Sequence, residues 1–512
     1  MSFNSFSFIL IFLPLVVILW YTLSAMKKWK IADYMLIASS IILYGLFSYK
    51  FVIILFLSAF ITYEISRLII TSRDKKILLV FGIITNIGLL GYFKYTNFFL
   101  ENISIVTGRK IDSLAIVLPV GISFYIFSHI AFLVDTYREI VDNYSDPGEK
   151  VSAKSVTFTE YLLYITYFPK IIQGPIALPG EMISQFRDKE KRILKSENIA
   201  KGMQLFVIGL SKKVLLGDNL AKIADYGFLY TYYMDTITGI LVLVAYSFQL
   251  YFDFSGYCDM AEGVSYMLGI TLPQNFNSPY KALSVRNLWQ RWHMTLTRFF
   301  VRYVYIPLGG SRKGKLRTAL NVLIIFILSG FWHGAGWTYL CWGLIMGIMV
   351  VFDDLGIMAT KTDIKKSYLL REKPLIVIPE FLGKILTYIM FLISLVFFRS
   401  KNMTYAIQYF KQLCFFTWPG FLYKTASVLS ISENYLIRQA VNLVKKSLET
   451  PVYIASFAIL MIVSAFVMTR DNARELVFGE KIGKGYTVLL VILFVWSFIS
   501  LSQVSTFIYF NF

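Results

Sequence analysis

Long apolar stretches fill most of the chain and are separated by short polar interruptions. A helix needs about 20 predominantly apolar residues to cross the hydrocarbon core of a bilayer, so the pattern predicts roughly 10 to 13 transmembrane helices. The chain is therefore expected to be an all-α polytopic membrane protein. The predicted spans lie near residues 7–25, 31–49, 51–70, 77–95, 113–134, 157–177, 203–216, 236–252, 318–351, 380–398, 452–468 and 485–510.

The interruption from Val285 to Val304 has a helical pattern of its own. Its apolar residues recur at spacings of three and four, and its arginines fall on the other side of the helix. This pattern is typical of a basic amphipathic helix that lies in the interface of a membrane. His293 falls where the apolar face meets the basic face. The sequence therefore predicts a titratable side chain at the edge of the membrane.

The organisation of the chain indicates one membrane domain. No internal repeat is visible, and the longest polar segments, 138–156, 182–201 and 358–375, are too short to be soluble domains. We expect a single domain over residues 1–512, with a motif-bearing core at about 113–355 and further spans over 380–512. The first apolar run has its lysines behind it, unlike a cleaved secretory signal. It is therefore predicted to remain as the first span, with the N-terminus outside.

Composition supports a membrane protein and excludes several other classes. The 512 residues are 57% hydrophobic and only 16% charged, whereas soluble domains average about 25% charged residues. The formal net charge of +19 comes mostly from the short interruptions. This is the positive-inside pattern of cytoplasmic loops rather than a nucleic-acid-binding surface. The 3 cysteines lack paired spacing and predict buried core residues, with no disulfide framework and no metal site.

The chain has only 3 histidines, and His333 has the most unusual surroundings. It lies in a stretch from Thr318 to Phe352 that has no Asp, Glu, Lys or Arg. Counting about 1.5 Å per helical residue from Thr318 places His333 roughly 22 Å along a helix, well inside the bilayer. A neutral imidazole there can act as general base for a hydroxyl nucleophile. The alternative is a buried histidine hydrogen-bonded between helices, which is the interpretation we favour for His129.

Three carboxylates follow a predicted span in apolar and aromatic surroundings. They are Asp253, Asp259 and Glu262, in the segment "QLYFDFSGYCDMAEGVSYMLGI". Each would cost about 2.5–3.5 kcal/mol at the centre of a bilayer. We therefore expect them to face a cavity or to pair with the arginines of residues 286–302. A structural ion-pair network explains them equally well.

A helix break is predicted in the segment "YFPKIIQGPI", from Tyr167 to Ile176. Two prolines and a glycine interrupt an otherwise apolar run there. Broken helices occur at membrane depth where the backbone is buried in protein or lines a cavity. The segment is therefore a candidate re-entrant turn.

Together these motifs resemble the membrane-bound O-acyltransferase family, specifically its bacterial alginate O-acetylase-like branch. The similar stretches, in order, are "FLPLVVILWY", "SFYIFSHIAFLVDTYR", "YFPKIIQGPI", "YFDFSGYCDMAEG", "RNLWQRWHMTL", "YVYIPLGGSR" and "LSGFWHGAGWTYLCWG". They extend over roughly two thirds of the chain, to about residue 343. The resemblance implies a ring of helices around a central funnel, with re-entrant and interfacial helices.

The resemblance also assigns roles to residues of this chain. It implies that His333 is the catalytic histidine and that His293 is the second catalytic histidine, on the cytoplasmic side. We expect Arg286, Arg291 and Arg298 to attract the phosphates of the acyl donor. The residues expected to line the substrate tunnel are Trp332, Gly334, Trp337, Asp253, Ser255, Asp259, Trp289, Trp292, Gln173 and Pro175.

The implied function is transfer of acetyl from cytoplasmic acetyl-CoA across the membrane, for O-acetylation of an extracytoplasmic cell-envelope polysaccharide. The resemblance implies a bacterial inner membrane, no bound cofactor, and a membrane-anchored extracytoplasmic acetyltransferase or acceptor protein as partner. A teichoic acid D-alanyl transferase is an alternative within the family. A transporter or flippase with a proton-relay histidine is an alternative from another class. The lack of two related halves, and two key histidines within 40 residues, favour an enzyme.

Overall fold

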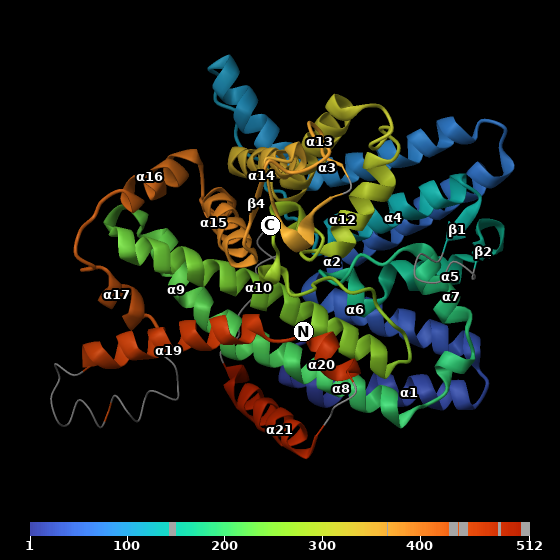
Figure 1. Ribbon diagram of the computed structural model, residues 1–512. Helices are drawn as coiled ribbons and strands as arrows, with labels where there is room; N and C mark the ends of the chain where they lie inside the picture. The colour runs from blue at the N-terminus through green and yellow to red at the C-terminus, as the bar shows by residue number, and fades with distance from the viewer. Residues whose placement is uncertain (143–149, 366, 430–438, 440–448, 480–482, 503–512) are drawn as a thin grey trace. The chain divides into compact units, whose positions relative to one another are not determined.

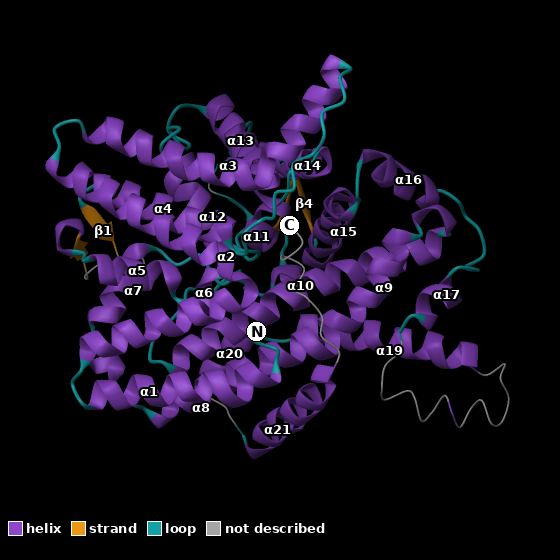
Figure 2. Cartoon of the chain, turned by 180° about the vertical axis from the view of Figure 1, so that it is seen from behind, coloured by secondary structure: helices purple, strands orange, loops and turns teal. Residues whose placement is uncertain are grey.

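The computed structural model describes residues 1–142, 150–365, 367–429, 439, 449–479 and 483–502. Nearly all regular structure in these residues is helical, and the strands form two small two-stranded sheets (Figure 2). Eight of the described helices are long and apolar enough to cross a membrane, and two shorter apolar helices accompany them. The prediction of an all-α polytopic membrane protein is therefore confirmed. The described chain forms two compact units.

The first unit comprises residues 1–207, 257–274 and 298–303. Its elements, coloured from blue to green in Figure 1, are η1 (Phe8–Phe12), α1 (Leu13–Ala25), α2 (Trp29–Thr71), α3 (Lys75–Thr107), α4 (Ile122–Tyr137), β1 (Ile140–Asp142), β2 (Lys150–Ser152), η2 (Ala153–Ser155), α5 (Phe158–Thr166), α6 (Phe168–Ile171), α7 (Pro179–Arg187), η3 (Glu190–Arg192) and most of α8 (Ser196–Ser211). Strands β1 and β2 pair antiparallel. Part of the core of this unit is an apolar cluster of Ile65, Ile69 and Leu133.

Local sequence explains where several of these helices begin, bend and end. Helix α2 has an extended backbone at Ser48, so it bends between the two spans that the sequence predicts there. Thr157 and Glu160 form a capping box at the start of α5, which satisfies two of the free amides there. The break expected from Tyr167 to Ile176 is confirmed, since α5 ends at Thr166 and only the short α6 follows before extended chain.

The second unit comprises residues 208–256, 275–297 and 304–512. Its elements are η4 (Lys212–Gly217), α9 (Asp218–Leu229), η5 (Thr231–Tyr233), α10 (Thr236–Met267), η6 (Pro279–Lys281), α11 (Val285–Trp289), α12 (Met294–Phe300), η7 (Val301–Tyr305), α13 (Lys315–His333), α14 (Trp337–Leu355), β3 (Met358–Thr360), η8 (Lys361–Asp363), β4 (Ile376–Ile378), α15 (Glu380–Arg399), α16 (Met403–Leu413), α17 (Leu422–Ser427), α19 (Glu449–Thr469), α20 (Ala473–Phe478), α21 (Lys484–Ile499) and η10 (Ser500–Ser502). Helices α10 and α12 and η7 have residues in both units. Strands β3 and β4 pair in parallel.

The predicted apolar run 318–351 is two helices rather than one. Helix α13 ends at His333, and α14 begins at Trp337 after three small residues. The two helices pack closely because glycines face each other: a Cβ on Gly343 would lie 2.3 Å from the Phe326 carbonyl oxygen and 3.3 Å from the Gly330 Cα. The helical count from Thr318 to His333 holds, because both residues lie within α13, and the depth of His333 in a membrane stays a prediction.

The amphipathic helix predicted from Val285 to Val304 is also interrupted. Helix α11 ends at Trp289, and α12 begins at Met294. Between them His293 has φ 44°, in the left-handed region that side chains rarely adopt. The prediction of one continuous helix is therefore wrong. The helix is interrupted because the backbone carbonyl of Asn275 accepts a hydrogen bond from the Met294 amide at 2.9 Å, in place of a bond within the helix.

The remaining predicted spans correspond to helices with shifted ends. The span at 113–134 begins only at Ile122, and α10 continues beyond the predicted end at residue 252. The last run, 485–510, is described only as far as Ser502. The single-domain organisation, the central funnel and the orientation in the membrane stay predictions.

Candidate active site

His333 is the last residue of α13 and is 4% exposed. Three aromatic rings surround its imidazole, with centroids 4.8 Å away for Trp332, 5.2 Å for Trp342 and 5.2 Å for Phe398. Trp332 is a predicted residue of this site, whereas the sequence does not predict Trp342 or Phe398. Trp342 could have been found only if the turn between α13 and α14 had been recognised, because that turn places it opposite His333.

The turn after His333 depends on a missing side chain at Gly334. A Cβ at this position would lie 2.1 Å from the ring of Tyr339. The Tyr339 ring packs in turn against Phe398, at 5.4 Å between centroids. Gly334 therefore allows the polypeptide to leave α13 directly beside His333 while an aromatic wall forms around it.

His293 is 1% exposed and hydrogen-bonds through Nδ1 to the Asn275 side-chain oxygen at 3.0 Å. The same oxygen accepts the Thr295 hydroxyl at 2.8 Å and the Thr295 backbone amide at 3.3 Å. Of the two terminal atoms of the Asn275 side chain, only the oxygen can accept a hydrogen bond from a backbone amide. The atom that faces His293 is therefore this oxygen, and His293 Nδ1 must be the donor. The proton of the neutral ring therefore resides on Nδ1, and Nε2 carries the lone pair.

The lone pair of His293 Nε2 is available for chemistry. Nε2 is buried and has no hydrogen-bond partner among the residues that the structure describes. Burial lowers the pKa of His293 from 6.5 to about 3, so the ring is neutral at physiological pH. A neutral imidazole with a fixed tautomer can accept a hydrogen bond or a proton from a hydroxyl group.

Trp332 connects the two histidines. Its ring lies 4.8 Å from the ring of His333 and 6.1 Å from that of His293, measured between centroids. Phe254 of α10 packs edge-on against the other side of the site, 4.8 Å from the His293 ring. The two histidines therefore both lie against the Trp332 ring in one aromatic chamber. We call this group the histidine chamber: His293, His333, Trp332, Trp342 and Phe254.

Indole groups provide polar donors near the chamber. Trp289 packs against Trp342 at 5.7 Å between ring centroids. The Nε1 atoms of Trp289 and Trp342 are buried and have no hydrogen-bond partner among the described residues. Such donors can stabilise negative charge that develops on a substrate oxygen. Trp292, in contrast, packs into a neighbouring aromatic cluster with Phe276 and Phe391, each at 5.2 Å.

Four other predicted tunnel residues differ in their placement. Trp337 is 58% exposed, and its predicted place in the lining of the tunnel stays a prediction. Ser255 is 1% exposed on α10. Gln173 and Pro175 are buried in the first unit, on the broken segment after α6. Their predicted place in a tunnel with His333 stays a prediction.

One of the embedded carboxylates, Asp253, pairs with a lysine rather than with an arginine of residues 286–302. Asp253 forms an ion pair with Lys213 of η4, and Lys213 also lies 2.7 Å from Asp218. Lys213 was missed because it lies 40 residues away in the sequence. Glu262 is buried and Asp259 is half-buried. Three of the four arginines of residues 286–302 bind other carboxylates.

Each of these arginines has its own partner. Arg286 Nε donates to Asp354 at 2.6 Å, and Arg291 Nε donates to the Asn287 side-chain oxygen at 3.1 Å. In the first unit, the Arg298 guanidinium donates to Glu181 at 2.8 Å and Arg302 pairs with Asp135 at 3.1 Å. Carboxylates therefore balance three of the four charges locally. Attraction of donor phosphates by Arg286, Arg291 and Arg298 stays a prediction.

The other histidine and the cysteines have no catalytic arrangement. Both ring nitrogens of His129 are hydrogen-bonded, Nδ1 to Tyr161 and Nε2 to Ser58 at 3.3 Å, which confirms its structural role. Cys258 is buried as predicted, but Cys414 is exposed. No cluster of side chains that could hold a metal ion occurs in the described part of the chain.

Comparisons with known proteins identify the family of this chain. The pattern that defines the membrane-bound O-acyltransferase family matches residues 148–368. A peptidoglycan O-acetyltransferase from Helicobacter pylori is 34% identical, over 100% of this chain and 97% of that protein. The probable alginate O-acetylase AlgI from Azotobacter vinelandii is 32% identical, over 69% of this chain and 68% of that protein. A teichoic acid D-alanyltransferase from Bacillus subtilis is 29% identical, over 37% of this chain and 50% of that protein.

The extent of these alignments decides the family. The similarity to the Helicobacter pylori protein covers 100% of this chain at 34% identity. The chain therefore belongs to the membrane-bound O-acyltransferase family, as an acyltransferase similar to the alginate O-acetylases.

Proposed function

We propose that this protein is a membrane-embedded O-acetyltransferase. It takes acetyl from cytoplasmic acetyl-CoA and passes it across the membrane, where a cell-envelope polysaccharide is O-acetylated. The protein resides in a bacterial inner membrane with its N-terminus outside. A membrane-anchored extracytoplasmic acetyltransferase, or another acceptor protein, receives the acetyl group and acts as its partner.

The observation that carries this proposal is the histidine chamber. It holds two buried imidazoles on either side of Trp332, and one of them has a fixed lone pair on Nε2. Apolar walls exclude water, which would otherwise hydrolyse a thioester, and they strengthen every electrostatic interaction inside. Acyl transfer to a hydroxyl needs a base in such a site and no metal or bound cofactor.

The proposed step assigns the base to His333. Its imidazole takes the proton of the acceptor hydroxyl while the hydroxyl oxygen attacks the carbonyl carbon of acetyl-CoA. The carbon–sulfur bond then breaks, and the proton passes to the departing thiolate. The products are an O-acetyl ester and the free thiol of CoA. His293 accepts a hydrogen bond at Nε2 and so orients the acceptor hydroxyl or a bridging water.

The relatives support acetyl as the group that is transferred. The Helicobacter pylori relative is named for O-acetylation of peptidoglycan and the Azotobacter vinelandii relative for O-acetylation of alginate. The D-alanyltransferase relative matches only 37% of this chain, in contrast to 100% for the first. Acetyl is therefore the group to test first, with D-alanine as the alternative.

The test is acetyl transfer by the purified protein in vesicles with radiolabelled acetyl-CoA. His333→Ala is expected to lower transfer of label by about 10²–10⁴-fold, the range for loss of a general base. His129→Gln is the matched control, because it also replaces a buried histidine but lies among structural hydrogen bonds. Thermal unfolding of each variant separates loss of chemistry from loss of folding.

The outcomes distinguish the alternatives. Label transferred by the wild-type protein and by His129→Gln, but not by His333→Ala, supports the proposal. Transfer of D-alanine from a charged carrier protein, with no transfer of acetyl, assigns the other acyl group to this chain. Equal transfer by His333→Ala and wild type removes His333 from the reaction.

A further inference from the structure

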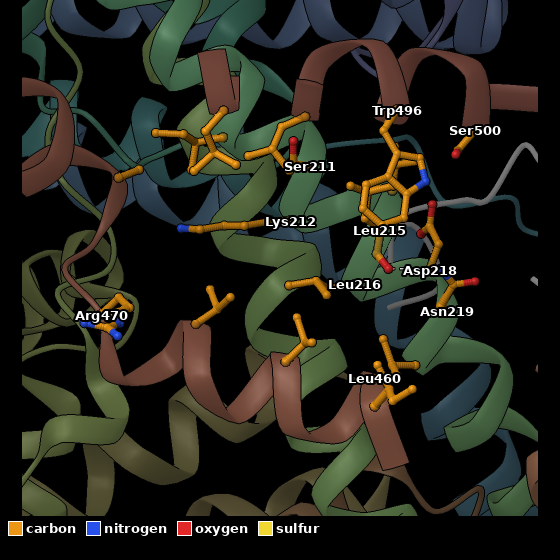
Figure 3. A pocket seen from close by; sticks show the side chains of 18 of the residues that line it. Ser211, Lys212, Leu215, Leu216, Asp218, Asn219, Leu460, Arg470, Trp496 and Ser500 are labelled. Carbon is orange, nitrogen blue, oxygen red and sulfur yellow. Dashed lines mark hydrogen bonds between the residues drawn. The ribbon is translucent and has the colours of Figure 1, made fainter. Parts of the chain in front are cut away.

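Two cavities of the second unit differ in the chemistry of their walls. The larger has a volume of about 540 Å³, is enclosed by η4, α19, α20 and α21, and is lined mainly by Leu, Ile and Val side chains (Figure 3). The smaller, which we call the Arg399 pocket, has a volume of about 230 Å³, and its wall includes Asp225, Phe228, Arg399, Lys401 and Tyr405. Aromatic walls with a few placed polar groups are typical of sites that bind a small polar molecule.

The Arg399 pocket lies where three helices end or begin. Helix α9 ends at Leu229, α15 ends at Arg399 and α16 begins at Met403, and both views show these helices close to one another (Figures 1 and 2). Helix α15 is long and apolar enough to cross a membrane, so its end marks the boundary of the apolar layer. Asp225 and Lys401 are exposed there. The pocket is therefore open to polar molecules.

Arg399 and Asp225 form the polar part of the wall. The Arg399 guanidinium pairs with Asp225 at 2.6 Å and lies over the rings of Phe228 and Tyr246, 5.5 Å and 5.9 Å from their centroids. Among the described residues, the bond between them is the one hydrogen bond that the two charged side chains make. A guanidinium has five N–H donors and a carboxylate has two oxygens, so donors and an acceptor remain for a ligand. Adjacent hydroxyl groups, which both donate and accept, match such a pair.

Rigid aromatic rings form the rest of the wall. The Tyr405 ring packs edge-on against Tyr232 at 5.6 Å between centroids, and the Lys401 ammonium lies 5.8 Å from the Tyr405 centroid. Phe228 packs against the buried Tyr409 at 4.8 Å. Aromatic side chains offer a large apolar area at fixed positions. A sugar ring has C–H groups on its faces and hydroxyl groups around its rim, so it fits an aromatic wall beside a polar pair.

The Arg399 pocket adjoins the histidine chamber at the end of α15. Arg399 directly follows Phe398, whose ring lies 5.2 Å from that of His333. Tyr339 packs against the same Phe398 ring at 5.4 Å. Successive residues of a helix point in directions about 100° apart. Phe398 therefore faces His333 while Arg399 faces the pocket.

The two ends of α14 assign the pocket to one side of the membrane. Arg286 binds Asp354 near the last residue of α14, whereas Phe398 packs against Trp342 near its first turn, at 5.0 Å. The Arg399 pocket thus lies near the end of α14 that is opposite to Arg286. The prediction that Arg286 attracts a cytoplasmic acyl donor places this pocket toward the extracytoplasmic side.

We propose that the Arg399 pocket binds one sugar unit of the polysaccharide that is O-acetylated. A C–H face of the sugar packs on Tyr405, and adjacent hydroxyl groups hydrogen-bond to Asp225 and Arg399. The volume of about 230 Å³ suits one sugar ring rather than an extended ligand. The proposal rests on the proposed function, in which a cell-envelope polysaccharide is O-acetylated, and adds that the polysaccharide itself binds to this protein beside His333.

The test measures binding of two oligosaccharides to the purified full-length protein in phosphatidylcholine nanodiscs, which contain no sugar detergent. The probes are a neutral tetramer of N-acetylglucosamine and an anionic tetramer of mannuronate, each titrated by saturation-transfer difference NMR. Wild type is expected to bind at least one tetramer saturably, and the tighter one identifies the class of sugar. No acyl donor is present, so the result does not depend on which acyl group the protein transfers.

Two variants locate the binding site, and each has a matched control. Tyr405→Ala is expected to weaken binding about threefold to tenfold, because the stacking ring is lost. Asp225→Asn is expected to weaken it about tenfold, because a charged acceptor is lost. The controls are Tyr423→Ala and Asp471→Asn, exposed residues of the same unit that do not line the pocket. Asp471, like Asp225, has a basic partner, Lys281 at 3.7 Å. Thermal unfolding confirms that all four variants are folded.

The outcomes separate this proposal from the proposed function. Weaker binding by Tyr405→Ala and Asp225→Asn, with unchanged binding by both controls, supports the sugar site even if no acetyl is transferred. Binding of neither tetramer to wild type would overturn the sugar site even if acetyl transfer is observed. Unchanged affinity in Tyr405→Ala or Asp225→Asn, or an equal loss in the controls, would place the sugar elsewhere and would also overturn it.

Discussion

At the scale of single residues, His293 shows how a strained backbone and a fixed side chain belong together. Its φ of 44° costs on the order of 1 kcal/mol or more for a side chain that is neither glycine nor asparagine. The hydrogen bond from Nδ1 to Asn275 and the two bonds from Thr295 to the same oxygen offset that cost. The result is an imidazole with one orientation and one tautomer. Asn275 is therefore a positioning residue.

Asn275→Asp tests this role. The carboxylate can accept the same hydrogen bonds, but its negative charge raises the pKa of His293, so the imidazole becomes protonated as the pH falls. Acetyl transfer is expected to be near wild type at alkaline pH and to fall by about 10–100-fold at acidic pH, where wild type keeps its activity. The measurement is a pH profile of kcat for both proteins. Parallel profiles would show that Asn275 acts only on folding.

The buried neutral state of His293 also makes the stability of the fold depend on pH. The pKa is about 3 in the folded protein and 6.5 as the ordinary value. Between these values the unfolded chain binds a proton that the folded chain does not. The neutral imidazole of His293 therefore contributes its full stabilisation of the folded state above about pH 6.5. Below that pH the free energy of unfolding decreases as the pH falls, by at most about 1.4 kcal/mol per pH unit.

His293→Gln removes this contribution because glutamine does not titrate. We expect the Tm of wild type to decrease more between pH 7 and pH 5 than the Tm of His293→Gln, as measured by thermal unfolding of purified protein. The absolute Tm of the variant at pH 7 does not enter the comparison. An identical decrease in both proteins would contradict a neutral, buried His293.

At the scale of elements, the crossing of α13 and α14 determines the geometry around His333. Gly330 and Gly343 allow the two backbones to touch, and this contact brings Trp342 of α14 to the ring of His333. Small residues at such crossings are typical of helices that pack inside a membrane. The chamber is therefore built by a close backbone contact as much as by its aromatic side chains.

Gly343→Ala is expected to separate these helices. Its Cβ would lie 2.3 Å from the Phe326 carbonyl oxygen, so the free energy of unfolding should decrease by about 1–3 kcal/mol and acetyl transfer should decrease with it. Gly88→Ala in α3 is the control, since nothing lies within 4 Å of its added Cβ. In a helix interior this change should increase stability by roughly 0.5–1 kcal/mol. Equal changes in stability and acetyl transfer for Gly343→Ala and Gly88→Ala would contradict the close contact of α13 and α14 at Gly343.

At the scale of the whole molecule, the bend of α2 raises the question of how many times this helix crosses the membrane. The helix extends from Trp29 to Thr71 with extended backbone at Ser48. Each part is near the length of one span. Basic residues flank both ends of α2, at Lys28 and Lys76. The positive-inside rule favours placing both ends in the cytoplasm, with the bend outside.

Cysteine labelling tests this topology. In a protein whose own cysteines are replaced, Tyr49→Cys should react with a membrane-impermeant maleimide in intact cells. Lys28→Cys and Lys76→Cys should react only after the cells are broken. All three positions are exposed, and Tyr49 is 75% exposed, so the membrane and not the protein would limit their reaction. Labelling of Lys28→Cys and Lys76→Cys from opposite sides would mean that α2 crosses once.

The sequence alone determined the class of the molecule and its candidate chemistry. Apolar runs near 20 residues are sufficient to identify spans, because the bilayer sets their length. A histidine in a stretch without charges identified His333, and the break after Tyr167 followed from Pro169, Gly174 and Pro175, since proline and glycine act on the local backbone. Each of these features depends on residues that are close in the sequence, so the sequence alone is sufficient to predict it.

Only the tertiary structure decided which residues meet. Helix α13 ends at His333 because three small residues permit a turn that apolar periodicity does not reveal, and this turn brings in Trp342. Asn275 interrupts the predicted amphipathic helix, and Lys213 takes Asp253, which sequence reasoning had assigned to arginines. Each partner lies distant in the sequence or behind a turn. Burial makes such pairings strong, but their choice depends on packing, which pattern and composition do not encode.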